Sequence, residues 1–238
     1  MFSPSFLRRL LLVGALASGA VVRAQDDEDG AVSSEFQTGV LSAYVSEGRE
    51  NFDGSPVIES CAVVAWQSVC LEVGNVTAFD NDGVEWTAGA AVEAEWAGMA
   101  WAAGYTHIWE DFDGEACEDD ELWLAVDMFS SESWNVCLES VYSFEADGLY
   151  WIAGVSWTVP TPDTFEVALF GAVSWDDGYA LEDFSGSDHV ELGVEVVLPL
   201  TTHSQLAGFV AGSWGLDGVR ADTNRDLFFG GVSYALEF

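Results

Sequence analysis

The stretch that decides the fold is residues 84–96, VEWTAGAAVEAEW. Every second residue from Val84 to Trp96 is apolar, and the residues between them include three glutamates. A period of two residues is typical of a β-strand with one apolar and one polar face, whereas helical spacing gives no comparable separation. We therefore predict that residues 84–96 form one long amphipathic strand.

The same alternation recurs along the chain from residue 35 to the C-terminus. It predicts twelve strands, at residues 35–47, 56–65, 69–79, 84–95, 98–109, 120–129, 134–145, 148–159, 164–175, 188–198, 204–214 and 226–238. Most of these segments exceed the about 5–6 residues of an ordinary globular strand and suit a tilted membrane-spanning strand of about 9–11 residues. Such a sheet must close, because an open edge in hydrocarbon would leave backbone groups without partners. The prediction is a closed antiparallel transmembrane β-barrel of about twelve strands.

The predicted connections support this fold because they alternate between short and mostly longer segments. The short ones centre on residues 66–68, 96–97, 130–133, 160–163 and 199–202, and the others span 48–55, 80–83, 110–119, 145–147, 176–187 and 215–225. Outer-membrane barrels have an even number of strands, short periplasmic turns and longer external loops. The alternation therefore places both ends of the barrel on the periplasmic side.

The 11 tryptophans provide a further argument for a membrane protein. The alternation puts all of them except Trp123 on the apolar strand faces, close to the predicted strand ends. Amphipathic aromatic residues gather at both membrane interfaces of a transmembrane barrel. A soluble β-sandwich would instead bury its tryptophans near the middle of its strands.

The N-terminus has the features of a secretory signal peptide. Arg8 and Arg9 precede an apolar stretch at 10–22, and Ala24 offers a cleavage site. The stretch is shorter than the roughly 20 residues of a spanning helix, which argues against the alternative of a membrane anchor. The predicted organisation is a cleaved signal peptide at 1–24, a short acidic segment at 25–34 and the barrel at 35–238.

The last predicted strand alternates up to a terminal aromatic residue. Tyr234, Leu236 and Phe238 lie on its apolar face. This pattern resembles the C-terminal signal by which outer-membrane proteins are recognised for barrel assembly. We therefore expect export to the bacterial outer membrane, where the partners would be the barrel-assembly machinery, the membrane lipid and the permeating solutes or cations.

The first predicted strand and the loop after it resemble the start of the TorF family of porins. That family opens with a Ser-x-Tyr strand, an aromatic-Arg-Gly turn and a second strand after a proline. The matching residues are Ser42, Tyr44, Gly48 and Pro56, while Ser46-Glu47 stands where the family has the aromatic-Arg pair. The resemblance implies a small outer-membrane porin, and it brings no family-specific active residue.

The chain is strongly acidic. It has 41 acidic residues against 6 basic ones, all of them arginine, and three of these arginines leave with the signal peptide. Such a chain would repel the phosphates of nucleic acid, so nucleic acid is not expected as a partner. Hydrophobic residues make up 50% of the sequence, which favours a folded protein over a disordered acidic segment.

The alternation directs a set of carboxylates into the barrel interior. They are Glu59, Glu72, Glu85, Glu93, Glu95, Asp127, Glu139, Glu145, Glu166, Glu191 and Glu195, followed by Glu237 near the C-terminus. No arginine lies clearly on an inward strand face. Rings of carboxylates select cations, although these acids would also solvate a polar interior, and the two interpretations are compatible.

Three functions follow from this pattern. The first is a porin-like channel for passive diffusion of small solutes, with a preference for cations. The second is a plugged structural or adhesive barrel without transport. The third is an outer-membrane lipid-modifying enzyme, and it has the least support because, of the three histidines His107, His189 and His203, neither His107 nor His203 has an evident base partner. No cofactor is indicated.

Two smaller features concern cysteines and metal ions. Cys61 and Cys70 flank the turn at 66–68, and a turn centred between Ala65 and Trp66 would place them opposite each other in the lumen. Their Cβ atoms would then be about 4.5–5.5 Å apart, so a disulfide needs a modest approach of the strands, and two reduced cysteines are the alternative. No dedicated metal site is indicated. Residues 111–115 faintly resemble a calcium loop, which makes Asp111 and Asp113 candidate cation ligands, but the ligand pattern is incomplete and a solvated external loop is the alternative.

Overall fold

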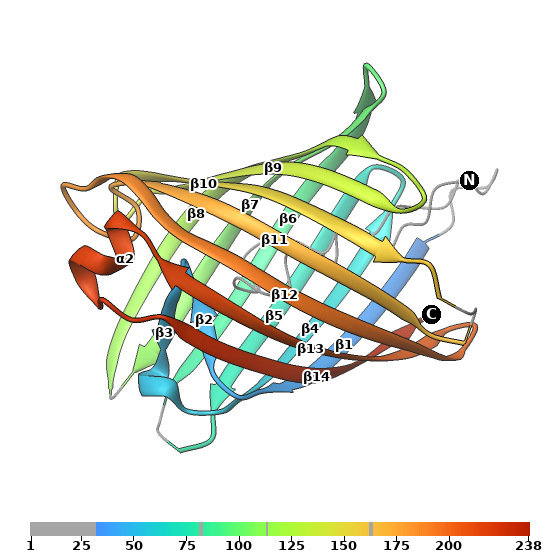
Figure 1. Cartoon of the computed structure of the whole chain (residues 1–238), viewed down its shortest axis with the longest axis horizontal. Coiled ribbons are helices and arrows are strands. Elements are labelled where there is room, and N and C mark those ends of the chain that lie inside the picture. Colours follow the sequence, from blue (N-terminus) through green and yellow to red (C-terminus); the bar gives the residue numbers. More distant parts are fainter. Residues whose placement is uncertain (1–31, 81–82, 113, 162–163) are drawn as a thin grey trace.

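A computed structural model describes residues 32–80, 83–112, 114–161 and 164–238. Within this part, twelve antiparallel strands form one closed barrel (Figure 1). The strands are β1 (Val32–Leu41), β4 (Val57–Trp66), β5 (Val69–Ala78), β6 (Val84–Trp96), β7 (Met99–Phe112), β8 (Glu115–Ser130), β9 (Trp134–Ser143), β10 (Gly148–Val159), β11 (Glu166–Asp177), β12 (Ser185–Thr201), β13 (Ser204–Gly215) and β14 (Leu227–Glu237). β1 closes the barrel by pairing with both β4 and β14. The predicted fold class is confirmed.

The strand bounds follow the alternation closely. Residues 84–96, which decided the fold, form β6 over their whole length. β1 begins at Val32, earlier than the predicted residue 35. The predicted signal peptide at 1–24 and residues 25–31 of the predicted acidic segment lie outside the described residues. The alternation works as a guide because successive side chains point to opposite faces of a sheet, here lipid and lumen.

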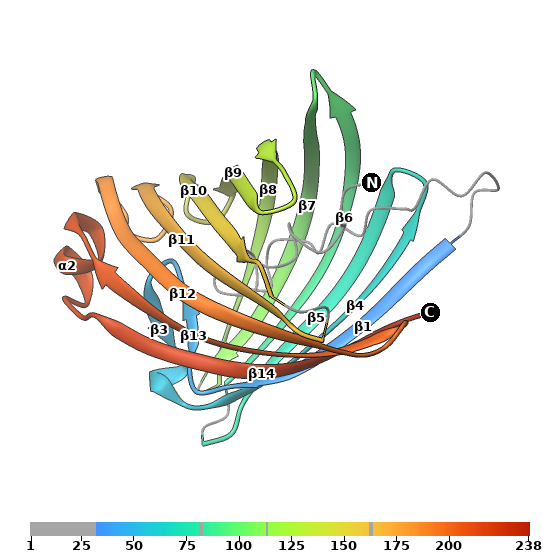
Figure 2. The same cartoon turned by 45° about the vertical axis from the view of Figure 1, so that its right-hand side comes forward.

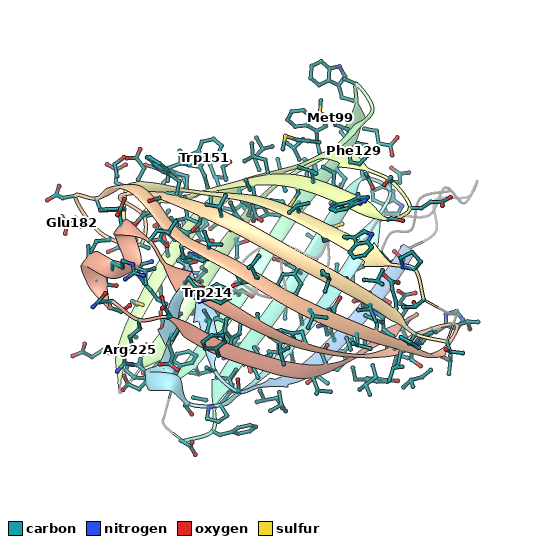
Figure 3. The ribbon with its side chains drawn as sticks, viewed as in Figure 1. Met99, Phe129, Trp151, Glu182, Trp214 and Arg225 are labelled. Carbon is teal, nitrogen blue, oxygen red and sulfur yellow. The ribbon has the colours of Figure 1, made fainter. Side chains whose placement is uncertain are left out.

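The outer face of the barrel is apolar and ringed by aromatic side chains. Leu71, Val210 and Phe228 are among its exposed apolar residues, an arrangement that marks a membrane-embedded surface. Trp134 and Trp157 stack with ring centroids 6.0 Å apart. Figure 3 shows Trp151 and Trp214 towards the end of the barrel where the helix α2 lies, with Met99 and Phe129 towards the other end.

Trp123 is the exception that the alternation predicted. Only 5% of it is exposed, and it packs with Ala102 and Ala125 in a buried cluster. Its ring lies over Gly104, where a Cβ atom would come within 2.4 Å of Trp123 Cε2. The lumen wall at this level is therefore partly apolar.

The connections predicted to be short lie close to their predicted positions. The two-residue turn at 97–98 has positive φ at both Ala97 and Gly98, which is the geometry of the tight hairpin turns that match strand twist. Val32 pairs with Trp66 beside the short β4–β5 turn, and Phe238 exchanges backbone hydrogen bonds with Ser34. Both ends of the described barrel thus lie on the side of the short turns (Figure 1).

The predicted external loop at 110–119 is wrong. β7 continues to Phe112 and β8 begins at Glu115, and these two residues pair directly. Acidic side chains do not interrupt a strand that rises above the membrane, because both of its faces are then in water. Asp111 accepts a hydrogen bond from the backbone N–H of Gly114 at 3.1 Å, and Asp113 lies outside the described residues.

The largest difference from the prediction is the segment 42–56, which was expected to continue the first strand to residue 47 and then form an external loop. Instead β1 ends at Leu41, and the chain turns into the barrel as β2 (Tyr44–Ser46), β3 (Arg49–Asn51) and the 3-10 helix η1 (Phe52–Gly54). β2 and β3 pair as a separate two-stranded sheet. Figures 1 and 2 show it inside the barrel near its external end. We call residues 42–56 the inserted hairpin.

The inserted hairpin packs on the inner wall through its own apolar side chains. Val45 lies in a buried cluster with Phe170 and Phe229, which face inward from β11 and β14. Tyr44 and Phe52 lie in a second cluster with inward-facing residues of β1, β4 and β5. This apolar contact on two sides explains why the segment lies inside the barrel rather than in external water.

The connection from β13 to β14 contains the short helix α2 (Asp217–Asp222), which lies at the external end of the barrel. Among the described residues, no helix has the length and apolarity needed to cross a membrane.

Candidate functional site: the acidic lumen and the inserted hairpin

Most of the predicted interior carboxylates lie at inward-facing positions of the barrel. Those in the buried class are Glu59, Glu85, Glu139, Glu191 and Glu195, and those at the same inward parity with greater exposure are Glu72, Glu93, Glu95, Asp127, Glu166 and Glu237. The Cys70 thiol, which is buried on the inward face of β5, lies 3.5 Å from Glu93 Oε1. The interior is therefore lined with acids along most of its length.

Glu145 is placed differently from the prediction. It lies in the exposed turn between β9 and β10, and its backbone N–H donates to Asp119 Oδ1 at 3.0 Å. β9 ends at Ser143, so the alternation that extends through residue 145 in the sequence no longer describes a strand. Glu145 is an external carboxylate rather than a lumen carboxylate.

Sequence reasoning missed four buried acids, Glu35, Glu121, Asp176 and Asp188. Glu121 lies on β8 at the same parity as Asp127, which was assigned to the lumen. Counting back from Asp127 in steps of two along the predicted strand at 120–129 would have found it. Glu35 is the first residue of the predicted first strand, and it has the same parity as Gln37.

The predicted Cys61–Cys70 pairing is wrong in register. The turn centres on Gln67 and Ser68, so Cys61 lies opposite Gly74 and Cys70 lies opposite Ala65. The two cysteines are thus offset by four residues along the hairpin, which corresponds to about 13 Å at the usual rise of a strand. A disulfide cannot bridge that separation.

Arg49 of β3 anchors the inserted hairpin to the barrel wall. Its guanidinium group binds Asp188 of β12 through two hydrogen bonds, both 3.1 Å long, and its Nε donates to Asp222 of α2 at 2.9 Å. The Asp188 side chain is fully buried. Two parallel hydrogen bonds between an arginine and a carboxylate form the strongest common ion-pair geometry.

The anchor has a second layer of hydrogen bonds behind Asp188. The hydroxyl of Tyr150 donates to Asp188 Oδ2 at 2.8 Å. The backbone N–H of Leu216, just before α2, donates to the Asp188 carbonyl at 2.7 Å. At the rim, Arg225 lies 3.6 Å from Glu50 of the hairpin. The hairpin is thus held by contacts to β12 and to the last external connection.

A serine, a histidine and an aspartate meet in this network. Ser174 Oγ lies 2.8 Å from His189 Nδ1, and Asp188 Oδ2 lies 3.1 Å from the same ring nitrogen. A hydrolytic triad uses the two opposite nitrogens of the imidazole for its serine and its carboxylate. The cluster is therefore a hydrogen-bond network around Asp188, and it does not have the geometry of a nucleophile with its base.

The turn of the inserted hairpin carries Glu47, and two tyrosines bond carboxylates of the barrel wall. Tyr44 donates from its hydroxyl to Glu85 Oε1 at 2.9 Å, and Tyr179 of the β11–β12 connection donates to Glu121 Oε1. Burial raises the pKa of Glu47 at the hairpin turn, and the nearby Arg49 opposes this shift. Burial, together with the charges of Glu85 and Glu47, also raises the pKa of Tyr44 well above its usual value.

The charge of Glu47 also acts on a second tyrosine, which bonds a carboxylate two strands away from Glu85. Burial, followed by the charges of Glu47 and Glu121, raises the pKa of Tyr179 well above its usual value. Glu47 is therefore close enough to influence phenols that are bonded to two different barrel strands. We call Glu47, Glu85 and Glu121, with the two tyrosines, the acidic cluster.

A closed twelve-stranded barrel with an apolar, aromatic-ringed outside and an acidic inside is an outer-membrane β-barrel. Comparisons with known structures agree. The chain is similar to the KdgM porin, which has also been solved in complex with disordered oligogalacturonate, with a TM-score of 0.58 and 8% identity over 87% of this chain and 99% of that one. It is also similar to the COG4313 outer membrane channel from Pseudomonas putida F1, with a TM-score of 0.50 and 13% identity over 88% of this chain and 96% of that one.

No protein-family model matches the sequence, and neither does any curated protein. At these low identities the structural likeness shows the shared barrel fold. The bacterial outer membrane expected from the sequence agrees with that fold. The four residues that carry the resemblance to TorF porins, Ser42, Tyr44, Gly48 and Pro56, all lie in the inserted hairpin.

Proposed function

We propose that the chain forms a porin-like channel for passive diffusion of small solutes, with a preference for cations. The observation that carries this proposal is the one-sided charge of the interior. Inward-facing carboxylates come from strands around the barrel, whereas no barrel strand of the described residues carries an arginine or a lysine. Fixed carboxylates in a pore attract cations and repel anions.

Arg49 does not reverse this charge. It reaches the lumen from the inserted hairpin, where Asp188 and Asp222 both bind it. The two carboxylates together outweigh its single positive charge. The net charge around Arg49 therefore stays negative.

Reversal potentials in a KCl gradient test the preference, using the mature chain refolded into planar bilayers. We expect potassium to be more permeant than chloride at neutral pH. We also expect the selectivity to fall at a pH below about 4, because ordinary carboxyl groups are then protonated. Anion selectivity at neutral pH would contradict the proposal.

The inserted hairpin supports a second candidate, a plugged barrel whose external connections form the working surface. Residues 42–56 occupy the external end of the lumen and are packed on two walls. Removing residues 43–54 distinguishes the two functions. If the barrel is a channel, both forms conduct and the shortened form conducts more. If it is plugged, only the shortened form conducts. Heat-modifiable mobility in gels shows that each form has folded.

A further inference from the structure

We propose that Asn135 and Ser156 form a binding site in the lumen wall for one hydroxyl group of a neutral polyol. This inference rests on the proposed porin-like channel and names a class of solute that its lumen binds. The two residues lie opposite each other on β9 and β10, where they are Cα partners. Directly opposed residues of an antiparallel pair point to the same face of the sheet, with Cβ atoms about 4.5–5.5 Å apart.

Both side chains point into the barrel and are almost completely buried. Asn135 is 2% exposed and Ser156 is 3% exposed, whereas their sequence neighbours Trp134 and Val155 are exposed on the outer face. Among the described residues, Asn135 Oδ1 and Ser156 Oγ have no hydrogen-bond partner. Buried polar atoms without a partner are unfavourable. The two neighbouring atoms do not bond each other either, so a group that bonds both is missing between them.

Asp127 fixes the orientation of the Asn135 amide. The amide Nδ2 donates a hydrogen bond to Asp127 Oδ1 at 3.2 Å. Turning the amide round would place its oxygen against this carboxylate, so Oδ1 remains the atom without a partner. The site therefore offers one acceptor, Asn135 Oδ1, and one hydroxyl group, that of Ser156, which can both donate and accept.

These two atoms determine which chemical group fits between them. A hydroxyl group accepts a hydrogen bond from Ser156 and donates one to Asn135 Oδ1, so it satisfies both atoms. An ammonium group only donates and would leave the Ser156 hydrogen without an acceptor. A carboxylate only accepts and would leave Asn135 Oδ1 without a donor, and the nearby Asp127 would repel it. A neutral hydroxyl group is therefore the best match.

A water molecule has the same donors and acceptors, so a polyol also needs room beside the pair. The next inward pair along β9 and β10, away from the β8–β9 turn, is Cys137 and Gly154. Gly154 in turn pairs with Ala172 of β11. These small side chains extend little into the lumen. A solute with several hydroxyl groups can therefore lie along the wall while one of them occupies the position between Asn135 and Ser156.

Saturation-transfer NMR on the detergent-refolded mature chain tests the site with the polyol meso-erythritol. We expect saturable binding that Ser156→Ala weakens by about tenfold, because a hydrogen bond in a buried site is lost. Ser156→Thr keeps the hydroxyl group and should retain most of the binding. Ser213→Ala is the matched control, since Ser213 is also buried with an unpartnered Oγ but lies opposite Glu191. It should leave erythritol binding unchanged.

The outcomes separate this site from the channel proposal. No erythritol binding would mean that the pair holds a water molecule only, and equal weakening by Ser156→Ala and Ser213→Ala would mean that general polarity attracts the polyol; either result would overturn the site. Equally tight, Ser156-dependent binding of 1,4-diaminobutane would overturn the choice of a hydroxyl group.

The channel itself is judged by its current. Potassium-selective current without Ser156-dependent erythritol binding would overturn the site and leave the channel standing. Ser156-dependent binding in a barrel without current would support the site and refute the channel. Heat-modifiable mobility confirms that each variant is folded.

Discussion

Gly48 and Arg49 decide how firmly the inserted hairpin is docked. Gly48 has a φ of 71°, and a Cβ atom there would lie 2.6 Å from His189 Cγ. Arg49 meets a fully buried aspartate in a two-bond ion pair. One residue lets the hairpin approach the wall, and the other holds it there.

Gly48→Ala should destabilise the docked hairpin. Gly98→Ala is the matched control, since Gly98 also has positive φ but no atom lies within 4 Å of its would-be Cβ. Gly98→Ala should lower stability by about 1 kcal/mol, because alanine is unfavourable in a left-handed backbone conformation. Gly48→Ala should cost more, because the methyl group also collides with His189. Limited proteolysis of the hairpin and unfolding midpoints measure the difference, and equal losses would contradict the close contact.

Arg49→Ala should release the hairpin more strongly than Arg225→Ala. Removing one partner of a buried ion pair costs about 3–5 kcal/mol because the other charge stays buried and unpaired. Arg225 is exposed, and its ion pair with Glu50 is 3.6 Å long. Its loss should therefore lower the stability of the docked hairpin by about 0–1 kcal/mol. Single-channel recordings should show larger or noisier conductance for Arg49→Ala only. Indistinguishable traces from the two variants would argue against the anchoring role of Asp188.

The inserted hairpin is also the element that the sequence predicted least well. Alternation is a local property, so it identified Tyr44 and Val45 as extended, which they are in β2, although both are buried there. It could not tell that Val45 meets Phe170 and Phe229, because those partners are distant in sequence. The anchoring partner Asp188 lies 139 residues away from Arg49 and left no local signal.

The register of the β4–β5 hairpin was missed for a different reason. Its turn places Gln67 at a φ of 55°, although glycine and asparagine are the residues that usually adopt positive φ. Without that signal the turn centre was placed two residues too early, at Ala65 and Trp66. Such a shift preserves the face of every side chain, so the inward acids were still assigned correctly while the cysteine pairing was not.

The docking of the inserted hairpin should strengthen on acidification. Burial raises the pKa of Glu47 when the hairpin is docked, while Arg49 and His189 act against the shift and Asp188 adds to it. A carboxyl group whose pKa is higher in the docked state binds its proton more tightly there. It therefore favours docking when the pH is below its ordinary pKa. This contribution is lost as the pH rises through the raised value.

Hydrogen exchange of the hairpin amides at pH 4 and pH 8, corrected for intrinsic rates, measures this effect. The corrected protection should be higher at pH 4. Glu47→Gln should remove most of the difference, because its side chain does not titrate. Greater protection at pH 8 in the unmodified chain would refute the sign of the linkage.

For the molecule as a whole, closure and charge are the main constraints. The regular alternation and the aromatic positions were sufficient to predict a closed barrel, because a membrane permits few other β-structures. The same barrel concentrates carboxylates in a narrow lumen, where they repel one another. The apolar outer face in lipid must outweigh this repulsion for the barrel to remain folded.

Salt should therefore stabilise the barrel. Raising NaCl from about 0.01 M to about 0.5 M shortens the screening length from about 30 Å to a few ångströms, which weakens repulsion among the acids. We expect the urea midpoint of the refolded chain to rise over this range. Sucrose at matched osmolality controls for solvent exclusion, and a midpoint that salt does not raise beyond the sucrose effect would contradict the view that self-repulsion limits stability.

The contacts of the inserted hairpin also set an order of events during biogenesis. The hairpin belongs to the first connection of the barrel, yet Arg49 depends on Asp188 and Asp222, which lie 139 and 173 residues further along the chain. The inserted hairpin must therefore keep its charged groups in water until the C-terminal third of the chain has folded and β1 has paired with β14. The inserted hairpin can therefore dock only in a completed barrel. In a nascent or truncated chain it stays undocked until the last strands are present.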